Sequence, residues 1–157
     1  MEKNRADEMN NLSTIFLKMI KETLLEIDWE VVLISNVDLS FKKNDQKTIV
    51  STKQNMFFIN AEEMDHISIQ EIVKQIHHGI KTQPPLFPAT NQIIFFYQKS
   101  PMDDEWILSN GKKQDIAKSN YTVSWVIDLN KKKLYAHKGL PLIKSGKKEI
   151  ESVLQQL

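Results

Sequence analysis

The chain has 157 residues and no cysteine, and its length fits one domain with a sizeable core. The lack of cysteine excludes disulfides, thiolate metal sites and cysteine nucleophiles, and it agrees with a reducing compartment. The first residues are charged and precede an amphipathic stretch, so the sequence predicts neither a signal peptide nor a transmembrane span. We therefore expect a single soluble domain over residues 1–157, located in the cytoplasm.

The formal net charge of +1 hides an uneven distribution along the chain. Residues 110–148 hold ten lysines and two aspartates, whereas residues 1–109 hold eleven basic and sixteen acidic side chains. The lysine-rich stretch contains no arginine, the residue best suited to bidentate recognition of bases and phosphates, so sequence-specific nucleic-acid binding is not expected. The lysines are either a solvated surface or a contact to a protein partner or an anionic membrane surface. The expected contact residues are Lys131, Lys132, Lys133, Lys147 and Lys148.

The first half of the chain predicts a helix, a strand and a hairpin. Apolar residues at three- and four-residue steps from Leu12 to Ile27 predict an amphipathic helix. The run Trp29–Ile34 predicts a strand, and the runs Lys47–Ser51 and Asn55–Ile59 predict the two arms of a hairpin.

A second helix is expected after this hairpin. Ser68 followed by Glu71 forms a capping box, in which the serine accepts a backbone hydrogen bond and the glutamate reaches back. Ile67 and Ile72 are placed to form the hydrophobic staple of the same helix start. The helix must end before Pro84, because proline removes a backbone donor and restricts its predecessor.

The second half of the chain predicts three further elements. The run Ile93–Tyr97 is apolar without alternation, which is typical of a central strand covered on both faces. Tyr121–Ile127 alternates and leads through a turn into Leu134–His137, which predicts a hairpin with one solvated face. Ser145 is placed to cap a final helix. The expected fold is α/β, of the α+β type, with a mixed sheet of four to six strands and three main helices packed against it.

The best candidate for a site follows the predicted central strand. There the chain turns at a proline into adjacent carboxylates, which could bind a divalent cation such as magnesium or manganese through oxygen ligands. The candidate metal ligands are Asp103 and Asp104, and Trp106 is a candidate partner contact. The alternative is a solvated loop in which an aspartate caps the next turn and Trp106 anchors it to the core.

The sequence contains no complete catalytic motif. His77 and His78 are adjacent on the predicted helix, so they point roughly 100° apart and cannot both face one metal. The triplet Asp45-Gln46-Lys47 matches the acid-x-lysine pattern of metal-dependent nucleases, but it has glutamine where an acid is wanted and falls in a predicted turn. Phosphate-binding loops and a glycine-flanked nucleophilic serine are absent. We therefore expect no catalysis by this chain.

The order of these elements carries a family resemblance. A helix, a hairpin ending in Met56–Ile59, a capped helix and then Ile93–Phe96 leading to a proline, two aspartates and Trp106 resemble the cytosolic N-terminal domain of rhomboid intramembrane serine proteases from Gram-positive bacteria. The layout is similar over roughly residues 12–128, and residues 93–106 match in kind.

The resemblance implies a non-catalytic accessory or regulatory domain at the inner face of the cell membrane, followed beyond Leu157 by the transmembrane protease. Ser145-Gly146 lacks the preceding glycine of the family's active-site motif, so no catalytic residue carries over. The resemblance makes Asp103 and Asp104 candidates for divalent-cation sensing or partner contact. It also puts the lysine-rich stretch near the inner leaflet.

Two other functions remain open. The chain could be a free-standing cytoplasmic protein-binding module, in which the acidic turn and the lysines are interaction surfaces of opposite sign. It could also be a metal-dependent nuclease-like domain, which requires a buried acid beside Lys47.

Overall fold

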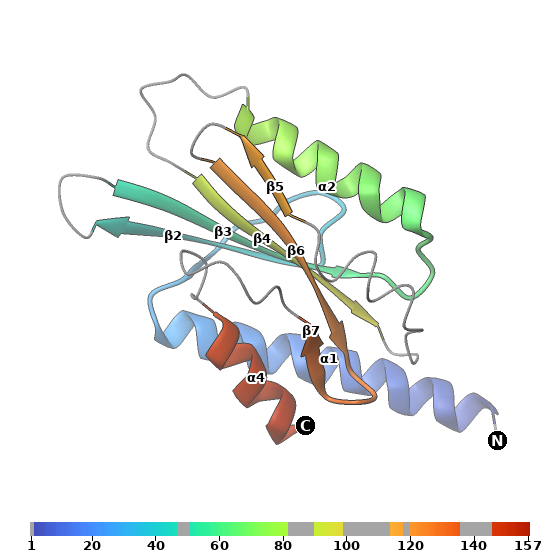
Figure 1. Cartoon of the computed structure of the whole chain (residues 1–157). Coiled ribbons are helices and arrows are strands. Elements are labelled where there is room, and N and C mark those ends of the chain that lie inside the picture. The colour runs from blue at the N-terminus through green and yellow to red at the C-terminus, as the bar shows by residue number, and fades with distance from the viewer. Residues whose placement is uncertain (1, 47–50, 82–89, 99–113, 118–119, 136–145) are drawn as a thin grey trace.

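The computed structural model describes residues 2–46, 51–81, 90–98, 114–117, 120–135 and 146–157 (Figure 1). The elements are α1 (Glu2–Glu26), β1 (Glu30–Val31), β2 (Leu39–Gln46), β3 (Ser51–Asn60), α2 (His66–Lys81), β4 (Thr90–Gln98), β5 (Gln114–Ala117), β6 (Asn120–Asp128), β7 (Lys133–Tyr135) and α4 (Lys147–Gln156). Among these residues, α1 is followed by three strands, α2 is followed by four strands, and α4 is the last element.

The strands form one mixed sheet. Six of them lie in the order β1-β2-β3-β4-β6-β5, and β7 joins as a seventh strand by pairing with β6. Strands β3, β4 and β6 are parallel to one another, and the other pairings between described strands are antiparallel. Since β4 pairs along β6 over residues 121–128, β5 and β7 share the opposite edge of β6.

The helices cover both faces of the sheet, so the domain has three layers. Figure 1 shows α1 and α4 on one face and α2 on the other. The predicted α+β fold, with three helices in the described part of the chain packed on a mixed sheet, is confirmed. The six-strand path meets the upper end of the predicted strand number, and β7 adds one short strand beyond it.

Strand β4 is central and buried on both faces, as its continuous apolar sequence predicts. On the α1 and α4 side, the ring of Phe95 stacks on Phe58 with centroids 4.9 Å apart and meets Trp125 edge-on at 5.5 Å. On the α2 side, Ile94 and Phe96 belong to a second buried cluster. The period of two along a strand divides these neighbours between the two cores.

The hairpin boundaries differ from the prediction. The predicted turn after Ser51 is wrong, because Ser51–Asn60 forms one continuous strand, and the hairpin connects β2 to β3 instead. The polar residues near the start of β3 belong to a strand end that is only half-buried, so their polarity does not mark a turn. The strand predicted over Trp29–Ile34 is also shorter, since β1 covers only Glu30–Val31.

The predicted cap of α2 is wrong. The helix begins earlier, and the N–H of Ser68 donates to Oδ1 of Asp65 at 2.7 Å, so Asp65 is the capping side chain. Aspartate caps helices as well as serine does, and the Asp65 cap adds one more turn before Ser68. The predicted staple fails for the same reason, because Ile67 is 73% exposed while Ile69 is buried.

Two predictions about the last third of the chain also need correction. The predicted hairpin of β6 and β7 is confirmed, but its solvated face is not, because Thr122 to Leu129 are all buried and α2 covers the polar side. The cap predicted at Ser145 is replaced by Gly146, which has no side-chain cap. Gly146 has a φ of 91°, and a Cβ there would lie 2.3 Å from Cε of Met56, so only glycine fits without movement.

Candidate functional site

The three parallel strands end at the same edge of the sheet, which we name the carboxyl edge. Strand β3 ends at Asn60, β4 at Gln98 and β6 at Asp128. The registers align these ends, because Asn60 is paired with Tyr97 and Gln98 with Asp128. In open α/β sheets ligands bind outside the carboxyl ends of the strands, so this edge is the candidate site.

A buried tyrosine, Tyr97, forms a hydrogen bond that connects the loop before β2 to the carboxyl edge. Oδ2 of Asp38 accepts the hydroxyl of Tyr97 at 3.0 Å and the N–H of Asn60 at 2.7 Å. Burial of the ring, and then the charge of Asp38, raise the pKa of the Tyr97 phenol well above its ordinary value. The phenol therefore stays protonated at neutral pH and acts as a hydrogen-bond donor, not as a base.

The end of β6 presents a buried carboxylate. Asp128 is 0% exposed, and its Oδ1 accepts the N–H of Lys131 at 3.0 Å, which closes the turn between β6 and β7. Its Oδ2 is buried and has no hydrogen-bond partner among the described residues. Next to it, the amide nitrogen of Gln98 donates to the carbonyl of Ala61 at 3.2 Å, so the ends of β4 and β3 are tied together. Asp128 therefore stabilises the turn after β6 from inside the fold, and its side chain is closed off from solvent.

An acidic cleft lies where the chain leaves β3. It has a volume of about 500 Å³ and is lined by Asn60, Glu62, Glu63 and Met64. The N–H of Glu62 donates to Oδ1 of Asn60 at 3.0 Å, which fixes the turn at the mouth of the cleft. The carboxyl edge thus combines carboxylate and amide oxygens, the donor types that hard divalent cations prefer.

The acidic turn itself, with Asp103, Asp104 and Trp106, lies outside the described residues. The strand that precedes it is described, and β4 ends at the carboxyl edge only five residues before Asp103. Among the described residues no group of three histidine, cysteine, aspartate or glutamate side chains could hold a metal ion. A cation at this edge therefore needs further ligands, and Asp103 and Asp104 have the right chemistry to supply them.

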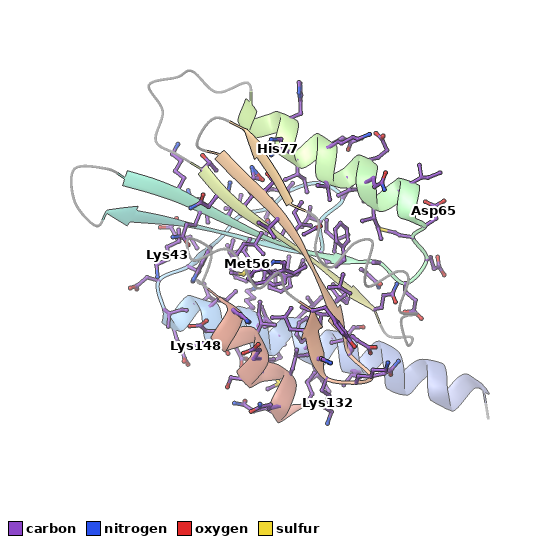
Figure 2. All side chains as sticks on the ribbon, viewed as in Figure 1. Lys43, Met56, Asp65, His77, Lys132 and Lys148 are labelled. Carbon is purple, nitrogen blue, oxygen red and sulfur yellow. The ribbon has the colours of Figure 1, made fainter. Side chains whose placement is uncertain are left out.

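The predicted lysine contacts fall at two separate places. Lys131, Lys132 and Lys133 are exposed on the hairpin between β6 and β7, directly after Asp128. Lys147 and Lys148 lie at the start of α4, and Figure 2 shows Lys148 and Lys132 near opposite ends of that helix. The structure therefore does not gather the five lysines into one patch.

The two histidines of α2 diverge as predicted. His78 is exposed, whereas His77 points from α2 toward the sheet and its Nδ1 lies 2.5 Å from Oγ1 of Thr122 (Figure 2). A hydroxyl next to an imidazole is the pairing of a nucleophile and its base, but His77 is 2% exposed and Thr122 is 1% exposed. A substrate cannot reach either group, so the pair serves to hold α2 against β6.

Four residues that share the carboxyl edge were not predicted from the sequence as parts of one site: Asp38, Tyr97, Gln98 and Asp128. The available signal was that polar residues end two predicted strands, at Gln98 and at Asp128. Nothing in the sequence shows that these two strands are parallel neighbours, which is what brings the two side chains together.

No described helix is long and apolar enough to cross a membrane. Comparison with known proteins identifies no relative, since no family model, no curated protein and no solved structure matches the chain.

Proposed function

We propose that this chain is a non-catalytic regulatory domain that works at the cytosolic face of a membrane-embedded, rhomboid-type serine protease. In this proposal the carboxyl edge is the recognition surface, which takes a divalent cation or a protein partner. The protease active site belongs to transmembrane helices that follow the domain.

The observation that carries the proposal is the position of β4. This strand is central, is buried on both faces and ends at the carboxyl edge. The sequence then continues into the proline, the two aspartates and the tryptophan on which the resemblance to rhomboid N-terminal domains rests. A buried strand that ends at the carboxyl edge is a rigid support for the residues that follow it, and this supports a sensing role for the acidic sequence after β4.

A regulatory role also agrees with the chemistry of the buried polar groups. The Tyr97 phenol keeps its proton, and the Thr122 hydroxyl and the His77 imidazole are closed off from solvent. These groups contribute hydrogen bonds to the fold. The Asp128 carboxylate belongs to the same group, because it is fully buried and its Oδ1 accepts the N–H of Lys131 in the turn after β6.

A titration with manganese or magnesium tests the cation part of the proposal. Thermal unfolding of the wild-type chain should shift upward as the metal concentration rises, because a ligand that binds the native state stabilises it. An Asp103→Asn, Asp104→Asn double variant should lose this shift. A Glu149→Gln, Glu151→Gln variant removes two carboxylates from α4 and should keep it. If metal shifts the unfolding temperature of neither the wild type nor the acidic-turn variant, the carboxyl edge does not bind a cation, and the proposed ligand is a protein partner.

The protease context has its own test. A reading frame that continues past Leu157 into several apolar spans supports the proposal, and removal of residues 1–157 from that protein should leave peptide-bond cleavage intact while abolishing its regulation. A stop codon directly after Leu157 contradicts the proposal, and the chain is then a free-standing protein-binding module.

A further inference from the structure

We infer that the domain lies against an anionic membrane through the tip of the hairpin between β6 and β7, and that the lysines at the start of α4 take no part. The hairpin patch consists of Lys131, Lys132 and Lys133. This inference rests on the proposed function, since it assumes that the domain works next to a bilayer.

The hairpin patch is a local excess of positive charge. Its three lysines are consecutive and all exposed. The nearest acid in the hairpin, Asp128, is fully buried and its Oδ1 accepts the backbone N–H of Lys131. The Asp128 carboxylate therefore shapes the turn from inside, while the three ammonium groups lie on the outside.

The hairpin patch is joined to the end of α4. Nζ of Lys132 donates to the backbone oxygen of Leu157 at 2.7 Å, and Figure 2 shows Lys132 beside that end of the helix. A cation at this position is also favoured by the negative end of the helix dipole. Residues 152–157 carry no charged side chain, so the surface formed by the hairpin and the helix end has no acidic side chain on either segment.

The start of α4 has a different charge balance. Lys147 is half-buried and pairs with Glu151 at 4.0 Å, and Glu149 lies in the same first turn. Lys147 and Lys148 are therefore offset by two glutamates on the same helix. The ten residues of α4 span about 15 Å at 1.5 Å per residue, which exceeds the Debye length of about 8 Å at physiological salt. The two groups of lysines act separately.

An anionic bilayer fits the hairpin patch better than a nucleic acid does. Lysine is a compact point charge suited to diffuse attraction, and the patch offers no guanidinium fork for bases or phosphates. In the proposed protease the chain would leave α4 toward the membrane. Positive charge retained next to a following span is the pattern expected on the cytoplasmic side.

Binding of the 157-residue chain to vesicles tests the inference with two matched double variants. Vesicles of phosphatidylcholine and phosphatidylserine that carry a spin-labelled lipid should broaden amide signals of residues 129–135 and 152–157 most. Lys131→Gln, Lys133→Gln should lower the partition coefficient roughly 30-fold, at about 1 kcal/mol for each lysine. This pair leaves the contact between Lys132 and Leu157 intact. Lys147→Gln, Lys148→Gln removes the same charge and should change the partition coefficient less than 3-fold.

Three outcomes would overturn the inference: no binding of the wild type to anionic vesicles, equal weakening by both variants, or binding to duplex DNA in preference to vesicles. The protease proposal fails by a different result, a stop codon after Leu157. If the chain binds vesicles through the hairpin patch but a stop codon follows Leu157, the membrane inference stands and the protease proposal fails. If the reading frame continues into apolar spans but the chain does not bind anionic vesicles, the protease proposal stands and the membrane inference fails.

Discussion

The two faces of the sheet are filled in different ways. The face under α1 and α4 holds one large apolar cluster in which aromatic rings such as Phe58, Phe95 and Trp125 contact one another. The face under α2 is apolar where Ile69 and Val73 pack, but polar where His77 meets Thr122. The first face is held by packing, whereas the second also depends on hydrogen bonds.

The path of α2 explains the polar half of its face. Because β3 and β4 are parallel and α2 connects them, the helix starts near the carboxyl edge and runs back toward the amino ends of the strands (Figure 1). Its later residues therefore meet the beginnings of β4 and β6, where Gln92 and Thr122 are paired and both are buried. Buried polar groups favour hydrogen-bond partners, and His77 of the helix supplies one to Thr122, whereas Oε1 of Gln92 has none among the described residues.

The largest expected effect compares two neighbours on β4 that face opposite cores. Phe95→Ala should lower the free energy of unfolding by about 4 kcal/mol, because it empties the centre of the aromatic cluster. Phe96→Ala, on the α2 side, should cost about 3 kcal/mol, since the cluster there is smaller. Urea unfolding of both variants measures the difference. An equal or larger loss at Phe96 would show that the two faces contribute alike.

The next largest loss of stability is expected in the polar half of the face under α2. Thr122→Val keeps the shape of the side chain but removes the hydroxyl bonded to His77, and it should cost about 1–3 kcal/mol. Thr122→Ser retains the hydroxyl and should recover most of that loss. Urea unfolding again gives the values. If valine is tolerated as well as serine, the hydrogen bond does not stabilise the position of α2.

The difference between the two faces of the sheet also explains which parts of the fold the sequence could predict. The continuous apolar run of β4 correctly predicts a central strand, because apolar residues on both faces require cover on both. The alternation of β6 indicates a polar face, but polarity does not determine exposure, and α2 covers Thr122 and Ser124. The expectation of a solvated face was therefore wrong.

The candidate site was harder to predict than the core. The acidic turn is visible in the sequence, and the end of β4 that leads to it lies at the carboxyl edge as described above. Asp38 and Tyr97 come together from positions 59 residues apart, and Gln98 and Asp128 meet only because β4 and β6 are parallel neighbours. Strand order and register carry this information, and no local pattern reveals either one.

A smaller effect appears at high pH, where the carboxyl edge can be compared with β7. Because the pKa of Tyr97 is raised in the folded state, the unfolded chain loses this proton first, above about pH 10. The contribution is complete below that pH, and stability falls as the pH rises further, by at most about 1.4 kcal/mol per pH unit. Asp38 is exposed, so solvent screens its part of the pKa shift and narrows the pH range over which stability falls.

Two tyrosine variants isolate this effect. Tyr97→Phe should flatten the fall in unfolding free energy between pH 9.5 and 11, whereas Tyr135→Phe, which changes a half-buried tyrosine of β7, should leave the wild-type slope in place. Equal slopes in wild type and Tyr97→Phe would mean that the phenol does not hold its proton against Asp38.

The smallest effect concerns the start of α2, where the apolar half of its face begins. Asp65→Ala removes the side chain that accepts the N–H of Ser68, and it should cost about 1 kcal/mol in thermal or urea unfolding. Ser68→Ala should change stability by less than about 0.5 kcal/mol, since Ser68 lies inside the helix and is exposed. The reverse order would restore Ser68 as the cap. If Asp65 is the cap, its loss should fray only the first turn, because Ile69 and Val73 still hold the helix to the sheet, and amide exchange near His77 should stay slow.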